Sequence, residues 1–365
     1  MGWSKILKQY TSRFVMSEKK PVILAMSDGK AGHETQTQGL IQVLNHHQQY
    51  EVEWVVLQLH NKLSFKIIRF LLKFFLNTAW LKYFLTLEQL FEISKRPVRY
   101  IVSAGGNTLV ANALLKKYLS VELEYPVQNI VASSLRGVPA RCFDAVFTIH
   151  VEQKDLAHYV YYPIAPNKMT ASLLTQDQAR KNLGILYTEF VITILIGADT
   201  KNVKIGSAQK WAAALLMIRQ QYPAARILLS SSRRSSVEFE QQLSQYVEEN
   251  NIFHANDQIV WVAQGQSCDI KDFIKAADWI LASPDSTSMT AEVIMAEKKL
   301  VILDAEQMSD QAIQSQLLYL QQQKQLIQWD LNSTQALPAL IETIELQPHS
   351  QLFYQVLSDK LKHFS

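Results

Sequence analysis

Cysteine is scarce in this sequence of 365 residues, which contains only Cys142 and Cys268. Two cysteines so far apart argue against a disulfide framework and fit a reducing compartment such as the cytosol. Neither has a Cys or His neighbour at metal-ligand spacing, and the chain has no Asp-x-Asp motif. We therefore expect neither a metal nor a cofactor, and we interpret both cysteines as small buried hydrophobic residues.

Long uncharged apolar runs are also missing. The stretch that comes closest to a membrane span, residues 63–85, contains no acid and four cations: Lys66, Arg69, Lys73 and Lys82. Four charges are costly at the centre of a bilayer, which argues against a span. The first three cations share one helix face, so we predict a basic amphipathic helix lying on a membrane surface. The alternative is a core helix with one solvated basic face.

Acidic residues are sparse in the first hundred positions, which hold 14 Lys or Arg and 7 Asp or Glu. Their balance is +7, and because the whole chain carries +3, the remainder carries −4. This distribution predicts an anionic surface or substrate for the first part of the chain. No arginine-rich stripe with interleaved aromatic residues is present, so nucleic acid is not an expected partner. Residues 1–20 lack the features of a signal peptide and are interpreted as a basic extension.

Short apolar runs alternate with helical patterns along most of the chain. A first set of strand-like runs lies at 21–26, 52–58, 98–102, 128–132 and 144–149. A second set lies at 190–196, 226–230, 258–262, 278–282 and 299–304. Helical periodicity covers 33–47, 107–119, 206–221, 236–249, 268–277 and 287–298. Apolar strands joined by helical crossovers predict an α/β fold with two doubly wound, Rossmann-like parallel-sheet domains.

The connection between the two domains is expected near residues 160–188. The stretch from Tyr161 to Asn167 has two prolines and no periodicity, which is typical of the start of a linker. We place an N-terminal domain at 21–165, a linker at 166–188 and a C-terminal domain at 189–345. Residues 346–365 predict a last helix, and on fold analogy alone we expect it to pack back toward the N-terminal domain.

Two glycine-containing turns follow strand-like runs in the first half of the chain. They are Ser27-Asp28-Gly29-Lys30-Ala31-Gly32-His33 and Ser103-Ala104-Gly105-Gly106-Asn107-Thr108. In an open parallel sheet, ligands bind outside the carboxyl ends of the strands, so both turns are predicted to line one crevice. Asp28 and His33 are both plausible general bases for removing a proton from an acceptor hydroxyl, and the choice between them stays open.

The second half of the chain has three polar turns at strand ends. Gly197 and Lys201 follow the first strand-like run, and Arg233 and Arg234 follow the second. Lysine neutralises phosphate as a point charge, whereas arginine binds diphosphate bidentately. The third turn opens a helix with Ser286, Thr287, Ser288 and Met289, and Glu292 follows. Unpaired N–H groups at a helix start favour an anion, and a carboxylate two turns into the helix suits a sugar hydroxyl. The alternative for this turn is an ordinary helix cap.

These residues together resemble a known family. The resemblance rests on Ser27–His33 with Gln36 and Gly39, on Ser232-Arg233-Arg234, and on Asp285–Met289 with Glu292. In this order, over roughly residues 20–345, the chain is similar to the bacterial counterparts of the plant mitochondrial-fission "elongated mitochondria" proteins. Members of that family resemble GT-B glycosyltransferases. The last element also resembles the donor site of the Kdo transferase and of the lipid-linked N-acetylglucosaminyltransferase of cell-wall synthesis.

The resemblance implies a GT-B-like fold whose two domains face a cleft. It implies donor contacts at Ser286, Ser288, Met289 and Glu292, with Arg233 at the diphosphate, and acceptor-side chemistry at Asp28 or His33. We also assign Thr287, Gly197, Lys201 and Arg234 to the donor site. The remaining residues assigned to the acceptor side are Gly29, Lys30, Gly32, Gln36, Gly105, Gly106 and Asn107.

The resulting hypothesis is a metal-independent glycosyltransferase. It moves a sugar from a nucleotide sugar to a lipid-linked or cell-envelope glycan acceptor. The transfer is expected to be of the hexosyl or Kdo type and to belong to lipopolysaccharide synthesis. We expect a cytoplasmic protein held peripherally on the anionic inner face of the inner membrane. One alternative is a membrane-associated adaptor that has kept the fold and lost catalysis. Another is a nucleotide-sugar epimerase, which needs no acceptor.

Overall fold

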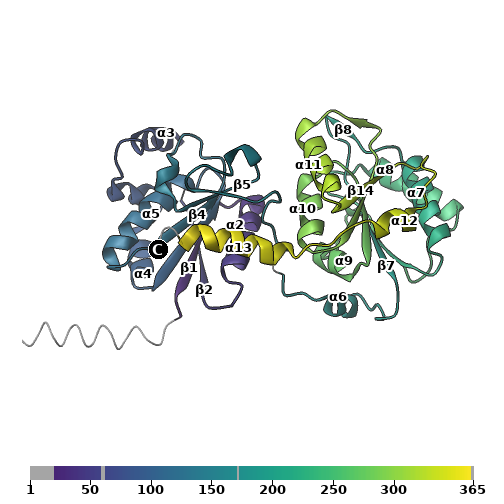
Figure 1. Cartoon of the computed structure of the whole chain (residues 1–365), viewed down its shortest axis with the longest axis horizontal. Coiled ribbons are helices and arrows are strands. Elements are labelled where there is room, and N and C mark those ends of the chain that lie inside the picture. The colour runs from purple at the N-terminus through teal and green to yellow at the C-terminus, as the bar shows by residue number, and fades with distance from the viewer. Residues whose placement is uncertain (1–19, 59–61, 171, 363–365) are drawn as a thin grey trace, which may run out of the picture. The chain divides into compact units, whose positions relative to one another are not determined.

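The structure is a computed structural model that describes residues 20–58, 62–170 and 172–362 (Figure 1). The chain divides into two compact units. Unit 1 holds residues 1–171 together with residues 350–365, and unit 2 holds residues 172–349. Each unit is described by itself below.

Unit 1 is built on a six-stranded, entirely parallel sheet with the strand order β2-β1-β3-β4-β5-β6. Its strands are β1 (Val22–Ser27), β2 (Glu51–Val56), β3 (Val98–Ala104), β4 (Gln128–Ala132), β5 (Ala145–Thr148) and β6 (Tyr159–Tyr161). Its helices are α2 (Ala31–Leu44), α3 (Lys62–Leu71), α4 (Leu87–Ser94), α5 (Leu109–Glu122) and α13 (His349–Lys362). Three short 3-10 helices complete it: η1 (Thr78–Tyr83), η2 (Ala140–Cys142) and η3 (Val151–Gln153). Parallel strands need helical crossovers, and these cover the sheet.

Unit 2 repeats this design with the strand order β10-β9-β7-β11-β12-β14, again all parallel. Its strands are β7 (Val191–Leu195), β9 (Arg226–Ser230), β10 (Gln258–Val260), β11 (Trp279–Ala282), β12 (Lys299–Leu303) and β14 (Leu326–Trp329). Its helices are α6 (Gln176–Asn182), α7 (Ala208–Gln221), α8 (Val237–Glu249), η4 (Val262–Gln264), α9 (Ile270–Ala276), α10 (Thr287–Met295), α11 (Gln311–Gln322) and α12 (Leu337–Glu342). A small antiparallel pair is formed by β8 (Val203–Lys204) and β13 (Gln307–Met308).

The prediction of two doubly wound α/β domains is confirmed. Every predicted strand-like run contains a strand, and the helical patterns match α2, α5, α7, α8, α9 and α10. Two outer sheet strands, β6 and β14, were missed: β6 borders the stretch interpreted as the connection between the domains, and β14 follows a glutamine-rich helix end. The predicted linker at 166–188 also contains α6, whose capping box joins Thr175 to Gln178 and whose Ala179 is fully buried.

The strand order of each sheet defines one switch point. In unit 1 the chain leaves β1 toward β2 on one side and leaves β3 toward β4 on the other. In unit 2 the same reversal falls between β7 and β11. Crossovers on either side of such a point run on opposite faces of the sheet, so a crevice opens outside the carboxyl ends of the two strands. The loops after β1, β3, β7 and β11 therefore occupy the positions where open α/β sheets bind ligands.

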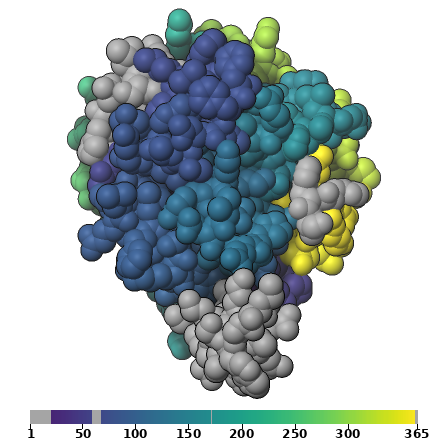
Figure 2. Space-filling view, turned by 90° about the vertical axis from the view of Figure 1, so that its left-hand side faces the viewer, coloured from purple at the N-terminus to yellow at the C-terminus, as the bar shows by residue number. Residues whose placement is uncertain are grey.

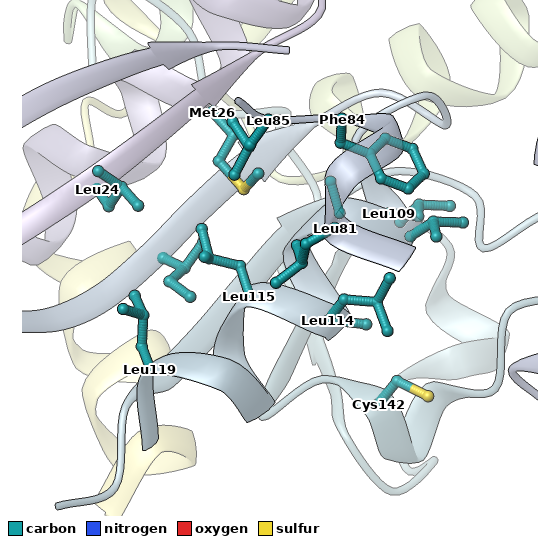
Figure 3. Close-up of a cluster of buried hydrophobic side chains, with 14 of the residues drawn as sticks. Leu24, Met26, Leu81, Phe84, Leu85, Leu109, Leu114, Leu115, Leu119 and Cys142 are labelled. Atoms are coloured by element: carbon teal, nitrogen blue, oxygen red, sulfur yellow. The ribbon is translucent and has the colours of Figure 1, made fainter. Parts of the chain in front are cut away.

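The predicted amphipathic helix over residues 63–85 is wrong in its length. α3 ends at Leu71, and the chain turns before η1, whose first turn is capped when the Asn77 side chain accepts from Ala79 N. The second half of the segment is core: Leu81, Phe84 and Leu85 are buried near Leu114 and Leu115 of α5 (Figure 3). A straight helix of this length would extend about 34 Å at 1.5 Å per residue, and the turn lets its second half bury apolar surface instead.

The surviving helix, α3, faces outward with apolar residues. Ile67 and Phe70 of α3 and Phe74 of the turn after it are more than half exposed. Ile68 and Leu72 are buried. Arg69, which we expected on the same basic helix face as Lys66 and Lys73, is partly buried. α3 and the turn after it form the dark blue part of the surface at the top of Figure 2. No helix in the described ranges is long and apolar enough to cross a membrane.

The C-terminal helix α13 contributes to the core of unit 1. Phe353 is fully buried, and its ring stacks on Tyr162 with centroids 4.9 Å apart and lies 5.2 Å from Phe147. Near the end of α13, the Leu361 carbonyl accepts a hydrogen bond from Gln128 Nε2. Unit 1 is therefore completed by residues from the far end of the chain.

Phe353→Ala should destabilise unit 1 by about 3–5 kcal/mol, because it removes a buried aromatic ring and leaves a cavity. Val356→Ala, on the same helix but 40% exposed, is the matched control and should change stability by less than about 0.5 kcal/mol. Urea unfolding followed by tryptophan fluorescence measures both. Equal effects of the two substitutions would show that α13 is not anchored through Phe353.

Candidate functional site

A buried carboxylate organises the switch point of unit 1. The Asp28 side chain is fully buried, and His33 Nδ1 lies 2.9 and 3.0 Å from its two oxygens. Asn107 Nδ2, from the loop after β3, donates to Asp28 Oδ2 at 2.8 Å. Three residues from the two predicted glycine turns thus meet at one carboxylate.

The charge state of Asp28 follows from these contacts. Burial raises the pKa of Asp28. Four effects lower it: side-chain hydrogen bonds with His33 and with Asn107, the positive charge available on His33, and a hydrogen bond with the Lys30 backbone. Together they outweigh burial, and the pKa of Asp28 is lowered. Asp28 is therefore ionised at neutral pH and can only accept hydrogen bonds. The proton of a neutral His33 then sits on Nδ1, which leaves Nε2 with a free lone pair.

Glycines shape this site by admitting neighbouring groups. Gly29 adopts φ +78° and its N–H donates to Ser27 Oγ at 2.9 Å. Gly105 adopts φ +84°, and a Cβ there would overlap the imidazole of His33. A Cβ at Gly106 would overlap the Arg136 side chain. Gly39 serves packing, because a Cβ there would strike the backbone of residues 166–167.

The other residues predicted for the acceptor side lie around this centre. Lys30 and Gly32 are exposed at the start of α2, and Lys30 makes no side-chain capping hydrogen bond. Gln36, one turn after His33, lines a cavity of about 270 Å³. The loops after β4 and β5 supply most of its other walls, with polar groups from Ser133, Thr148 and His150.

In unit 2 the corresponding buried carboxylate is Asp285, which the sequence analysis did not assign to the site. Its side chain is fully buried, and Arg234 Nη2 lies 2.7 Å from Oδ2. Oδ1 accepts from Ser283 Oγ at 2.5 Å, and Ala198 N donates to Oδ2 at 3.2 Å. Gly197 fits only because it has no side chain, since a Cβ would overlap this carboxylate. Asp285 thereby joins the loops after β7, β9 and β11.

A second buried carboxylate, Glu240 of α8, supports the loop after β9. It accepts from Ser231 Oγ at 2.5 Å and from the N–H groups of Ala263 and Gln264. Ser235 Oγ then donates to the Gly197 carbonyl at 2.9 Å. Glu240 gave no signal in the sequence because an acidic residue in a first helical turn is ordinary.

A cavity of about 490 Å³ opens beside these loops. Gly197 and Arg234 line it, together with residues of the α7 and α8 starts such as Ser207 and Phe239. Lys201 and Arg233 are exposed and do not line it. Arg234 is bound to Asp285, so part of its charge is already compensated. The free positive charge near the cavity is therefore smaller than the sequence suggested.

The turn at residues 286–292 begins as a capped helix. Ser286 is the N-cap of α10 and accepts from Met289 N, while its Oγ lies 3.2 Å from Ser288 Oγ. Thr287 and Ser288 are exposed, and Glu292 is half-buried within α10. None of these residues lines the 490 Å³ cavity, and the two parts of the predicted donor site are connected through Asp285.

Among the described residues, no group of three or more His, Cys, Asp or Glu is placed to hold a metal ion. Cys142 is buried, as expected, whereas Cys268 is partly exposed. Asp269 caps α9 by accepting from Lys271 N. The absence of a metal and a cofactor from the reaction stays a prediction.

Comparisons with known proteins give one family and a set of similar folds. A family model described as Mitochondrial fission ELM1 matches residues 31–349. No curated protein matches the chain. The UDP-GlcNAc 2-epimerase from Neisseria meningitidis bound to UDP-GlcNAc is 9% identical, with 94% of this chain and 100% of that chain covered and a TM-score of 0.48.

Two further solved structures show the same level of similarity. The UDP-GlcNAc 2-epimerase from Methanocaldococcus jannaschii is 13% identical, with 93% and 100% coverage and a TM-score of 0.47. The ADP-heptose lps heptosyltransferase II from E. coli is 14% identical, with 94% and 99% coverage and a TM-score of 0.40. At these identities and TM-scores, no activity is transferred to this chain.

Gly197→Ala should destabilise unit 2 by about 1–3 kcal/mol, because the new methyl group must displace the buried Asp285 carboxylate. Gly32→Ala is the matched control: its Cβ meets no atom within 4 Å, and alanine favours the helix. Thermal unfolding should show a lower melting temperature for the first variant and an equal or higher one for the second. An unchanged melting temperature for Gly197→Ala would mean that Asp285 is not held as described.

Proposed function

This chain belongs to the family described as Mitochondrial fission ELM1, and from that premise we propose that it is a metal-independent glycosyltransferase. Unit 1 binds an acceptor hydroxyl, and unit 2 binds a nucleotide sugar. The observation that carries the proposal is the Asp28–His33–Asn107 arrangement at the switch point of unit 1. An oriented imidazole one helical turn from Gln36, which lines a cavity, suits the removal of a proton from an acceptor hydroxyl.

His33 is the base and Asp28 is the residue that positions it. Both Asp28 oxygens are occupied and its side chain is fully buried, whereas the His33 side chain is 27% exposed. The acceptor O–H gives its proton to His33 Nε2 as the oxygen bonds to the sugar carbon. The bond from that carbon to the phosphate oxygen breaks, and its electron pair leaves with the nucleoside diphosphate. Asp28 stabilises the imidazolium that forms.

Unit 2 supports the departing diphosphate with protein groups. Ser286 already accepts from Met289 N, so the N–H groups that α10 offers to an anion are those that precede Met289 in its first turn. Arg233 and Lys201 are exposed cations free to approach an anion. Arg234 and Asp285 hold the loops in place rather than neutralising the leaving group. These positive groups would do the work that a divalent cation does in other transferases.

His33→Gln should lower the rate of sugar transfer by about 10²–10⁴-fold, because glutamine cannot take the proton. Asp28→Asn should also lower kcat, since an amide neither fixes the tautomer nor stabilises the imidazolium. The donor is first identified by the melting shift that UDP-, GDP-, dTDP-, ADP- and CMP-sugars produce. Transfer is then followed by mass spectrometry of the acceptor.

His46→Gln, an exposed histidine of the same unit, is the control and should transfer at the wild-type rate. Full activity of His33→Gln would remove the proposed base. Conversion of the nucleotide sugar without any acceptor would instead identify an epimerase. Absence of a melting shift with every nucleotide sugar would favour a membrane adaptor.

The proposed acceptor is carried by a membrane lipid or an envelope glycan, which places the protein on the cytoplasmic face of the inner membrane. The outward side of α3 and the turn after it support this assignment, with Ile67, Phe70, Phe74 and Phe75 each more than half exposed. Lys73 lies 5.7 Å from the Phe70 ring centroid. Aromatic side chains with neighbouring cations suit the headgroup region of an anionic bilayer.

Phe70→Ser/Phe74→Ser should weaken binding to phosphatidylglycerol vesicles by at least tenfold, because it removes two apolar anchors. Leu318→Ser, an exposed apolar residue of unit 2, should leave binding unchanged. Vesicle sedimentation measures both variants. Equal binding by the double variant and the wild type would exclude this surface from membrane attachment.

A further inference from the structure

Two arginines of unit 1, Arg69 and Arg136, have no counter-charge among the residues that the structure describes. Arg69 Nε is buried and has no hydrogen-bond partner. No ion pair of either guanidinium is found within the described part of the chain. Residues 54–87, which include all of α3, contain no Asp or Glu. A buried donor without a partner is costly, so this arrangement suits an anion that arrives from outside.

The two guanidinium groups act on one another. Burial lowers the pKa of Arg69, and the positive charge of Arg136 lowers it further. Repulsion between neighbouring like charges is relieved when one anion binds both. Arginine suits this role because its planar fork donates two parallel hydrogen bonds to phosphate oxygens.

The backbone holds Arg136 beside the proposed catalytic site. Its side chain lies against Gly106, which has no Cβ to block it, and Gly106 precedes the Asn107 that binds Asp28. Arg136 itself adopts φ +47°, a left-handed conformation that is unfavourable for a residue other than glycine. Farther along the chain, Arg141 of η2 donates to the Lys73 carbonyl in the turn after α3.

The position of Arg69 connects the pair to the proposed membrane surface. It lies on α3 between Ile68, which is buried, and Phe70, which is 57% exposed. A molecule anchored in a bilayer beside Phe70 and Phe74 would therefore meet Arg69 on its way toward His33. The cavity lined by Gln36 also includes Ser134 and Leu135, the two residues before Arg136.

We propose that Arg69 and Arg136 together bind a phosphate group of the acceptor, so that the acceptor is a phosphate- or diphosphate-bearing molecule. That the bound molecule is the sugar acceptor rests on the proposed function. That it carries a phosphate rests on the two arginines themselves. The arginines bind and position the acceptor, and they take no part in proton transfer.

The test uses the full-length protein and inorganic pyrophosphate as the probe, with binding measured by isothermal titration calorimetry. Arg136→Lys and Arg69→Lys should each weaken pyrophosphate binding by at least tenfold, because lysine keeps the charge but loses the bidentate geometry. Arg99→Lys is the matched control, since Arg99 is near the start of β3 and stacks on Tyr125. It should bind as the wild type does. Arg136 is exposed, so its variant carries the test if Arg69→Lys does not fold.

Three results would overturn the proposal. The first is no pyrophosphate binding by the wild type. The second is pyrophosphate binding that is weakened by Arg233→Lys of unit 2 but not by the Arg69 and Arg136 variants, which would place the anion at the donor site. The third is loss of phosphatidylglycerol-vesicle binding in the arginine variants with pyrophosphate binding intact, which would assign the pair to a lipid headgroup.

The transfer assay separates this inference from the proposed function. With an active wild type, the arginine variants should raise the KM for the acceptor at least tenfold and change kcat little. His33→Gln should lose transfer and keep pyrophosphate binding. If the wild type transfers no sugar but its pyrophosphate binding depends on the pair, the proposed function fails and the phosphate site stands.

Discussion

Parallel strand pairing is the constraint on which the rest of this structure depends. Each six-stranded sheet is entirely parallel, so every connection must return over a face of the sheet through a crossover. The carboxyl ends of all strands of a unit therefore lie at one edge, and the loops that follow the strands gather there. The strand order then decides which two loops flank the crevice. In unit 1 these are the loops that hold Asp28 and Asn107, and in unit 2 those that hold Gly197 and Asp285.

The two crevices share one device, a fully buried carboxylate that joins loops from different strands. Asp28 holds His33 and Asn107, and Asp285 holds Arg234 and the backbone of Ala198. In both units glycine allows the close approach, with Gly105 beside His33 and Gly197 beside Asp285. The outcomes differ, because the histidine of unit 1 keeps one free nitrogen, whereas the arginine of unit 2 is partly neutralised by its carboxylate.

The fold class could be predicted from the sequence because its signal is repeated. Ten apolar runs gave ten strands, and long helices such as α7 and α8 have the expected periodicity. The prediction of one helix over residues 63–85 was wrong because periodicity does not show which apolar residues are buried. Leu81 and Phe84 pack in the core with α5, whereas Phe70 is exposed. The strand β14 was missed because it follows a polar, glutamine-rich helix end.

The candidate site was only partly predictable. Loops at strand ends could be found, since Gly29, Gly105 and Asn107 follow apolar runs. The choice between Asp28 and His33 needed burial and geometry, which spacing does not supply. Asp285 was part of the motif that carries the family resemblance but was not predicted as a site residue; in the structure Ser286 is the helix cap, and the buried Asp285 carboxylate binds Arg234. Glu240 and the Arg69–Arg136 pair depend on contacts between distant segments, and no local pattern reveals these.

The anchoring of Phe353 against Tyr162 and Phe147 also has a consequence for biosynthesis. A ribosome releases the chain from its N-terminus, and domains generally fold in that order. Unit 1, however, includes residues 350–365, which are made after unit 2. The aromatic surface around Tyr162 must therefore wait, uncovered, while all 178 residues of unit 2 are synthesised. Unit 2 is the first unit that can be completed, although it is the second to be encoded.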